Sequence, residues 1–246
     1  MIVVLPPSET KRDSGDGPPV DVEALSFTEL NPVRIALVDE LVALAADRPA
    51  SRAALGISAK QDAEIDRNAA LRTSPTMAAI DRYTGVLYDA LDIASLSGAA
   101  GDRARARLAV GSALFGLLRA DDPVPAYRLS AGSKLPGPTL AARWRPALEP
   151  LLARLADGEL VVDLRSGSYT ALGRLPGAVT VDVVSERPDG SRAVVSHFNK
   201  AHKGRLARVL AAGRAEPDSA AKVATAARRA GMTVERDGNR LTVVTQ

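Results

Sequence analysis

The four residues after the initial methionine place the strongest single constraint on the fold. Residues 2–5 are all apolar, and Pro6 and Pro7 end the run at once. A continuous apolar run of this length predicts a strand that is buried on both faces, because a half-exposed strand would alternate apolar with polar residues. A strand of this kind needs a neighbour on each edge. We therefore expect residues 2–5 to lie inside a sheet.

The apolar periodicity changes about two thirds of the way along the chain. Before that point the spacing is helical, and helix-start signals occur at residues 31–32, where Asn31 is the expected cap, at 58–61 and at 74–75. Helices are expected at residues 33–48, 50–55, 108–118, 140–155, 200–212 and 219–230. Strands are expected at residues 160–164, at 179–184 and 193–198 around a turn at 188–190, and in a final hairpin over 232–244.

This order predicts the fold class and the domain organisation. One strand, then many helices, then strands with interspersed helices is typical of an α+β protein with one mixed sheet and surrounding helices, and does not fit regular βαβ winding. Neither an internal repeat nor a linker long enough to separate two units is present, so residues 1–246 are expected to form a single domain.

The composition excludes several kinds of site. The chain has no cysteine, which removes disulfides, thiolate nucleophiles and cysteine-ligated metals. His197 and His202 are not at a zinc-ligand spacing, so neither a metal site nor a cofactor is expected. No signal-peptide pattern or membrane-spanning apolar run is present, and we expect a cytoplasmic protein with no membrane partner.

Common catalytic signatures give little support for a named enzyme class. Glycine-rich dinucleotide and Walker motifs are absent. Ser8 and Lys11 match Ser-x-x-Lys, in which a lysine activates a serine, but the pattern here leaves a strand instead of opening a helix and its companion motifs are missing. Whether the chain is an enzyme therefore stays open.

Residues 50–71 contain a candidate nucleic-acid contact. Gly56 and Ser58 lie between two short helices and Lys60 follows, which resembles the turn of a helix-hairpin-helix module, where free backbone N–H groups meet a phosphate. A glycine that ends one helix and a serine that caps the next explain the same residues without any ligand, and that arrangement is the more common.

Basic residues are concentrated in two segments. Residues 101–145 hold eight bases and three acids, and residues 187–214 hold seven bases and one acid. This segregation is typical of an anion-binding face, although arginine-rich helices with solvated faces would produce it too. The candidate ligands of phosphate or carboxylate are Arg119, Arg128, Lys134, Lys200, Lys203, Arg205 and Arg208.

Six blocks in the chain resemble the YaaA family of bacterial peroxide-stress-resistance proteins, in the same order and at compatible spacings. The block over residues 111–132 is the most specific, since it resembles Ser-Gly-Leu-Tyr-Gly-x-Leu-Arg-Pro-x-Asp followed by Pro-Tyr-Arg-Leu-x-x-Gly. The other five are residues 7–11, residues 83–88, Trp144, residues 164–169 and residues 196–208. The chain departs from the family at Glu9, where the family has lysine, and at Ala120, Asn199 and Lys203.

The resemblance implies protection against hydrogen peroxide, through limited free iron, and DNA binding through a basic cleft and a helix-hairpin-helix element. The first hypothesis is therefore sequence-independent binding of double-stranded DNA, with Arg165 and Ser166 added to the basic residues above and to Gly56, Ser58 and Lys60. The rival is an enzyme acting on a small anionic ligand in a pocket, with Lys11, Tyr169 and Lys200 as catalytic candidates beside Ser8, Tyr127, Arg128 and Ser166. In either case the segment from Ser8 to Lys11 is expected near Lys200.

Overall fold

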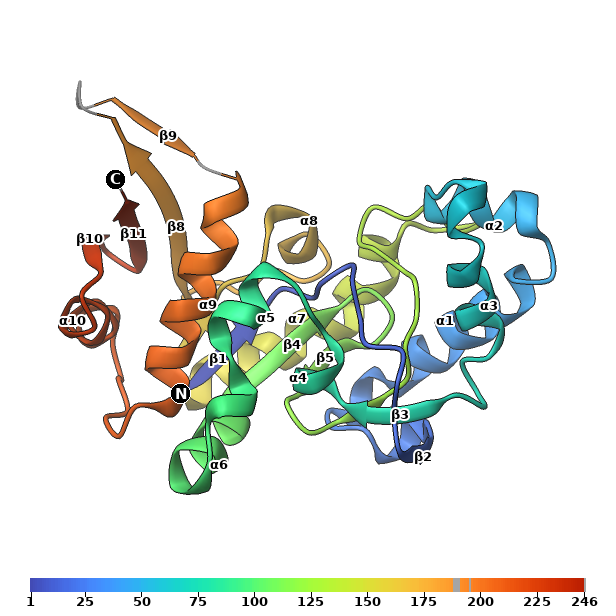
Figure 1. Cartoon of the computed structure of the whole chain (residues 1–246), viewed down its shortest axis with the longest axis horizontal. Helices are drawn as coiled ribbons and strands as arrows, with labels where there is room; N and C mark the ends of the chain where they lie inside the picture. Colours follow the sequence, from blue (N-terminus) through green and yellow to red (C-terminus); the bar gives the residue numbers. More distant parts are fainter. Residues whose placement is uncertain (188–190, 195, 246) are drawn as a thin grey trace.

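The computed structural model describes residues 1–187, 191–194 and 196–245. Its main sheet has eight strands, seven of them in the order β10-β11-β8-β7-β1-β4-β5, with β9 paired to β8 (Figure 1). A second, three-stranded sheet is formed by β2 (Gly17–Pro19), β3 (Pro75–Ala78) and β6 (Pro123–Val124). The predicted α+β class with a mixed sheet is confirmed.

Strand β1 (Ile2–Leu5) lies inside the main sheet, as its apolar sequence predicts. It pairs in parallel with β4 (Leu108–Ser112) on one edge and β7 (Val161–Asp163) on the other, and all four of its residues are buried. Strands β8 (Val179–Glu186) and β11 (Arg240–Thr245) extend the parallel part. The antiparallel strands are β5 (Gly116–Arg119), β9 (Arg192–Val194) and β10 (Thr233–Asp237).

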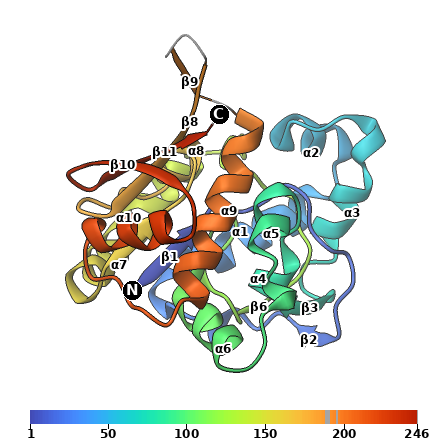
Figure 2. The same ribbon diagram turned by 60° about the vertical axis from the view of Figure 1, so that its left-hand side comes forward.

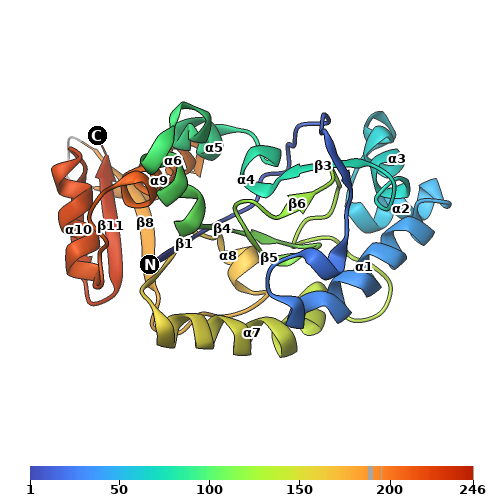
Figure 3. The same cartoon turned by 90° about the horizontal axis from the view of Figure 1, so that it is seen from below.

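Helices cover both faces of the main sheet (Figure 3). On one side lies α7 (Leu140–Gly158), whose Trp144 is buried and donates from Nε1 to the Ala113 carbonyl oxygen at 2.8 Å. On the other side lie α5 (Val86–Leu91), α6 (Gly98–Arg107) and α9 (Ser196–Ala212), with α10 (Ala220–Arg229) against the β10–β11 hairpin. Figure 2 shows α9 running alongside α5.

A helical lobe extends from the end of the sheet near β5 (Figure 1). It contains α1 (Asn31–Leu44), α2 (Arg48–Leu55) and α3 (Ala63–Ala69), and the short helices α4 (Ala79–Arg82) and α8 (Gly167–Thr170) lie nearer the centre. Single 3₁₀ turns occur at Val22–Ala24, Thr28–Leu30, Ala59–Gln61 and Ile93–Ser95. Buried Arg34 joins the lobe to the sheet by donating to the carbonyls of Phe115 (2.9 Å) and Leu117 (2.7 Å).

The helix predicted over residues 108–118 is wrong, because this segment forms the antiparallel pair β4–β5. An apolar run buried on every side carries no period that separates a helix from a strand. The turn is made locally: the Ser112 hydroxyl accepts from the N–H groups of Leu114 (3.2 Å) and Phe115 (2.9 Å), and Gly116 has φ +74°.

Two helix-start signals also have different outcomes from those predicted. The serine and proline at 74–75 begin strand β3, not a helix. At 31–32 a helix does start, but Asn31 lies within it and makes no cap; its side chain accepts from Arg34 Nη1 at 2.9 Å. Strands β8 and β9 form the predicted hairpin, but β9 ends at Val194 and α9 begins at Ser196, so the strand predicted to continue to residue 198 is wrong there; the expected turn at 188–190 lies outside the described residues. No helix in the described part of the chain is long and apolar enough to cross a membrane.

Candidate functional site

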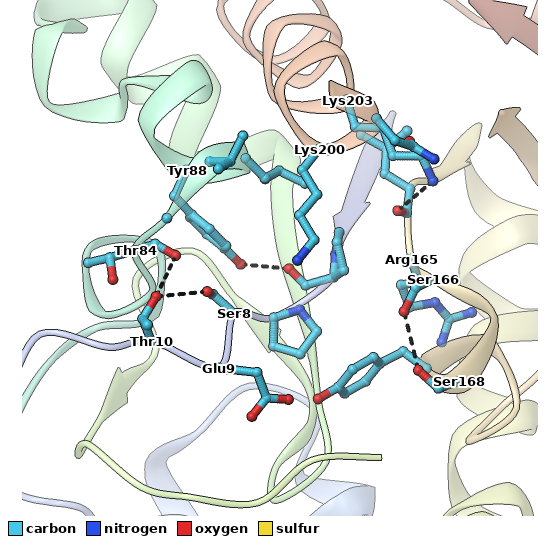
Figure 4. A pocket seen from close by; sticks show the side chains of 18 of the residues that line it. Ser8, Glu9, Thr10, Thr84, Tyr88, Arg165, Ser166, Ser168, Lys200 and Lys203 are labelled. Carbon is cyan, nitrogen blue, oxygen red and sulfur yellow. Dashed lines mark hydrogen bonds between the residues drawn. The ribbon is translucent and has the colours of Figure 1, made fainter. Parts of the chain in front are cut away.

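A cavity of about 860 Å³ opens at the carboxyl ends of strands β1 and β7 (Figure 4). Its wall combines segments that are distant in sequence, namely the exits of β1 and β7, the start of α5 and the first turns of α9. The lining residues are Pro6, Pro7, Ser8, Glu9, Thr10, Thr84, Gly85, Val86, Leu87, Tyr88, Leu164, Arg165, Ser166, Gly167, Ser168, Tyr169, Asp182, Asn199, Lys200 and Lys203.

The strand order explains the position of this cavity. The next strand of the main sheet after β1 is β4, on one side of β1, whereas the strand after β7 is β8, on the opposite side. The two chain segments therefore leave the adjacent parallel strands β1 and β7 in opposite directions. In open sheets with parallel strands, such a switch point leaves a crevice at the carboxyl ends, which is where ligands bind.

Hydroxyl groups line the wall that follows β1. The Ser8 and Thr10 hydroxyls are 3.1 Å apart, and Thr10 Oγ1 donates to the Thr84 carbonyl at 3.3 Å (Figure 4). Gly85 allows this close approach, because it has φ +97° and a Cβ there would lie 3.3 Å from Thr10 Oγ1. The sequence 83–88 thus brings a second loop against the exit of β1.

The wall that follows β7 is held by a buried ion pair. Asp163 accepts from Arg165 through Nε (2.9 Å) and Nη2 (2.8 Å) and also from its backbone N–H (3.0 Å), while Nη2 donates to the Gly173 carbonyl at 3.1 Å. The side chains are only 2% and 5% exposed for Arg165 and Asp163. Arg165 lines the cavity, but its charge is neutralised within the protein, and it shapes the loop that presents the exposed Ser166 and Ser168.

Helix α9 brings two lysines to the cavity. Lys200 is exposed, whereas the half-buried Lys203 donates from Nζ to the Leu164 carbonyl at 3.2 Å. Burial lowers the pKa of Lys203, against the opposing effect of the Asp182 and Asp163 charges. Neither amine has a carboxylate within ion-pair distance among the described residues.

Gly204 explains how α9 comes so close. A Cβ at this position would lie 2.2 Å from the Leu87 carbonyl oxygen and 2.9 Å from the Ala90 Cβ. Only glycine therefore lets α9 pack this tightly on α5, and that packing sets the position of Lys203 at the cavity wall.

Tyrosines at the site keep their protons at neutral pH. Tyr88 lines the cavity and donates to the Pro6 carbonyl at 2.9 Å, and burial raises its pKa well above the ordinary value. Burial and the nearby Glu9 charge also raise the pKa of Tyr169. A phenol with a raised pKa keeps its proton, so a general base at this site would have to be an amine or a carboxylate.

Three of the predicted pocket residues lie behind the wall. Lys11 donates to the carbonyls of Ser8 (3.1 Å) and Glu9 (3.4 Å), with Nζ 4.3 Å from the centre of the Tyr127 ring. Burial lowers the pKa of Lys11 to about 8. The hydroxyl of Tyr127 is buried between those of Ser112 and Tyr83, and Arg128 pairs with Glu9 at 2.7 Å.

The remaining basic candidates do not line this cavity. Arg119 lies over the Phe27 ring, and Arg208 donates to the carbonyls of Leu91 (2.8 Å) and Asp92 (2.6 Å). Lys134 and Arg205 are exposed elsewhere. Of the predicted site residues, the structure therefore brings Ser8, Arg165, Ser166, Tyr169, Lys200 and Lys203 to the cavity.

The segment at 50–71 has the helix ends that the sequence indicates. Gly56 has φ +65° and ends α2, and the backbone N–H of Ser58 donates to the Gln61 side chain at 3.2 Å. The N–H of Ile57 donates to the Arg52 carbonyl at 3.1 Å, so two of the turn's N–H groups are used internally. The features drawn from Gly56 and Ser58 are thus explained by capping, and a phosphate contact by Lys60 stays a prediction.

Several cavity residues had no motif to mark them. Thr84 and Ser168 lie inside blocks that resemble the YaaA family, which is the only signal that could have found them. Asn199 reaches the cavity from α9 and also lies inside such a block, whereas nothing in the local sequence of Asp182, which reaches the cavity from β8, indicates it. Within the described residues, no group of three or more histidines, aspartates and glutamates could hold a metal ion.

Comparisons with known proteins cover nearly the whole chain. The family model described as peroxide stress protein YaaA matches residues 1–235. A UPF0246 protein of Corynebacterium efficiens is 51% identical over 250 residues, which is 100% of this chain and 99% of the relative. A UPF0246 protein of Streptomyces coelicolor is 43% identical over 241 residues, 96% of this chain and 93% of the relative. An uncharacterized protein of Campylobacter jejuni is 26% identical over 213 residues, 86% and 85% of the two chains.

Proposed function

The chain belongs to the YaaA family of peroxide stress proteins, and from that premise we propose that it supports peroxide resistance by binding a phosphate-bearing ligand in the cavity at the ends of β1 and β7. The observation that carries the proposal is the pair of amines, Lys200 and Lys203, that line this cavity and form no ion pair with a carboxylate among the described residues. Action in the cytoplasm and a reduction of iron-linked damage are part of the same proposal.

The polar groups of the cavity suit a phosphate. Lysine binds phosphate as a point charge, and hydroxyls supply neutral donors around it. Ser8, Thr10, Ser166 and Ser168 offer such hydroxyls on the two loops that face α9. A volume of about 860 Å³ is in the range of sites that hold a nucleotide-sized molecule. The apolar parts of Tyr88 and Leu164 can pack against the organic part of that ligand.

Binding, not a defined reaction, is the function that these groups support. Among the amines, Lys203 and Lys11 are the candidates for a proton transfer, because the pKa values of both are lowered. Lys203 is at the wall and Lys11 is behind it, so Lys203 is the stronger candidate for such a step.

The test is equilibrium titration of the protein with thymidine 5′-monophosphate at low ionic strength. We expect saturable binding, and Lys203→Met should weaken it by about tenfold or more, the effect of losing one charge-assisted contact. Lys222→Met is the matched control, because Lys222 is exposed on α10 and pairs with Asp218 at 2.5 Å, away from the cavity wall. Absence of binding by the native protein, or equal affinity in Lys203→Met, would overturn the proposal.

Double-stranded DNA is the second candidate ligand, and the charge of α9 favours it. Arg205 is exposed two residues after Lys203, and burial together with the Arg205 charge lowers the pKa of His202. In the proposal, phosphates of the duplex contact Lys200 and Lys203 at the cavity, with Arg205 adding to the positive charge of α9, and the contacts do not read sequence.

A salt series tests the DNA proposal. The logarithm of affinity should fall linearly with the logarithm of salt, by about 0.9 for each phosphate contact, and replacing Lys200 and Lys203 by alanine should lower the slope by about two units. Absence of salt-dependent binding to duplex DNA by the native protein at low ionic strength would refute it. An unchanged slope in the double variant would place the contact surface elsewhere, with residues 119–134 next to be tested.

A further inference from the structure

Glu9 lies at the opposite end of the cavity from the two lysines (Figure 4). Its carboxylate is 2.7 Å from Arg128 Nη1. The glutamate side chain is 50% exposed, whereas that of Arg128 is 17% exposed. Glu9 is part of the cavity wall and Arg128 is not, so this ion pair joins a wall residue to a guanidinium outside the wall.

Arg128 is held firmly by its backbone but has spare hydrogen-bonding capacity in its side chain. Its backbone N–H donates to Asn68 Oδ1 and its carbonyl accepts from Asn68 Nδ2, each at 2.8 Å. The Nε of Arg128 is buried and has no hydrogen-bond partner. A buried guanidinium N–H without an acceptor is costly, so an anionic oxygen that reached this group would gain a hydrogen bond that the protein does not supply.

Lys11 adds a second positive charge near the ion pair between Glu9 and Arg128. Lys11 lies behind the loop with its amine directed at the carbonyls of Ser8 and Glu9, and the Glu9 carboxylate interacts electrostatically with both Lys11 and Tyr169. Removing the carboxylate would leave two positive groups just behind the wall, the Arg128 guanidinium and the Lys11 amine, without the charge of Glu9. That is the environment of an anion site.

We propose that Arg128, supported by the charge of Lys11, is a second anion subsite of the cavity, and that Glu9 fills it until a ligand displaces the carboxylate. The ligand then carries two phosphate groups, one held by Lys200 and Lys203 and the other by Arg128. This inference rests on the proposed function of the cavity. A half-exposed ion pair is weak in water, so an incoming phosphate can replace Glu9 at little energetic cost, while the backbone-anchored Arg128 stays in place.

The test compares two probes that differ by one phosphate, thymidine 5′-monophosphate and thymidine 3′,5′-bisphosphate. In the native protein the second phosphate has to displace Glu9 from Arg128, so it should add less affinity than it adds in a protein without this carboxylate. Glu9→Gln removes the competing charge and keeps the size of the side chain. We expect this variant to bind the bisphosphate about tenfold more tightly than the native protein does, with a distinctly smaller gain for the monophosphate.

Two further variants establish the cause of such a gain. Glu29→Gln removes a carboxylate that pairs with Arg154 outside the cavity wall, and it should change neither affinity. Arg128→Gln in the Glu9→Gln protein should abolish the extra gain for the bisphosphate. If that double variant does not fold, the comparison of Glu9→Gln with Glu29→Gln still decides the matter, because Glu9 is half exposed and its replacement leaves the packing intact.

The outcomes separate this inference from the function on which it rests. Suppose that the native protein binds the monophosphate through Lys203, but that Glu9→Gln raises the affinity for both probes equally or for neither. The second subsite is then refuted, and the cavity keeps its proposed function. If neither protein binds either probe, both proposals are refuted. Titration of a 12-base-pair DNA duplex into Glu9→Gln distinguishes the source of the two phosphates: a gain confined to the free bisphosphate indicates a small-molecule ligand, and a gain shared by the duplex indicates the DNA backbone.

Discussion

The substitution Asp163→Asn tests the central structural claim about the β7 side of the cavity. In the native protein the Asp163 carboxylate neutralises Arg165, and both side chains are at least 95% buried. The variant keeps an oxygen that can accept from the Arg165 backbone N–H but leaves the guanidinium charge unpaired. Removing one partner of a buried ion pair costs about 3–5 kcal/mol, because the remaining charge has no compensation.

This loss would be a large part of the total stability, since folded domains are stable by about 5–15 kcal/mol. With a urea m-value of about 3 kcal/mol/M, the unfolding midpoint should fall by roughly 1.0–1.7 M. Arg165 also fixes the loop that carries Ser166 and Ser168 to the cavity. Ligand affinity should therefore fall in the fraction of the variant that remains folded.

Urea unfolding followed by Trp144 fluorescence measures the change, because this tryptophan is fully buried. The double variant Asp163→Asn with Arg165→Met is the control, since it removes the unpaired charge and should be more stable than Asp163→Asn alone. A loss below about 1 kcal/mol in the single variant would refute the reasoning, as would further destabilisation when Arg165→Met is added.

Three other substitutions test the packing around the site. Gly204→Ala should lower the melting temperature and weaken cavity binding, because the new Cβ would meet the Leu87 carbonyl oxygen at 2.2 Å; thermal unfolding that matches the native protein would contradict this. Gly116→Ala should also destabilise, by more than about 1 kcal/mol, through a positive φ of +74° and a contact of 2.6 Å with the Trp144 ring, which urea unfolding would show. The pKa of Lys11 is lowered from 10.5 to about 8 in the folded protein, so between these pH values the unfolded chain binds more protons than the folded one. The free energy of unfolding of the native protein, measured relative to that of Lys11→Met, should therefore rise with pH across this window. A difference between the two proteins that is flat from pH 8 to 10.5 would show that Lys11 is not desolvated.

Local signals in the sequence predicted the helices and strands whose apolar residues recur at a regular spacing or whose ends are marked by capping or turn residues. Helix α7, the hairpin β10–β11 and the parallel strand β7 are where the pattern places them. The helix predicted at 108–118 was wrong because burial on all sides removes the alternation of apolar and polar residues that marks a strand. The decisive residues there are Ser112, whose hydroxyl holds the turn, and Gly116, whose positive φ starts the return strand.

The candidate site was predicted only in part. Ser8, Ser166, Tyr169, Lys200 and Lys203 do gather at one cavity. The sequence could not show which of the basic residues face the cavity, because the residue type does not reveal where a side chain lies or whether an ion pair already neutralises its charge. Arg165 is the clearest example: it lies at the cavity, yet its ion pair with Asp163 makes it a structural residue.

By itself, the sequence determined the central position of β1, the α+β class and the family, because each of these follows from apolar patterning or from motifs whose order along the chain is enough. Only the tertiary structure decided which polar side chains share a site. Glu9 and Lys203 line one cavity because the chain leaves the parallel strands β1 and β7 in opposite directions and because Gly204 lets α9 pack closely on α5, and Glu9 in turn pairs with Arg128. Those are contacts between segments more than 70 residues apart, and no local propensity encodes their distances or the charges that they cancel.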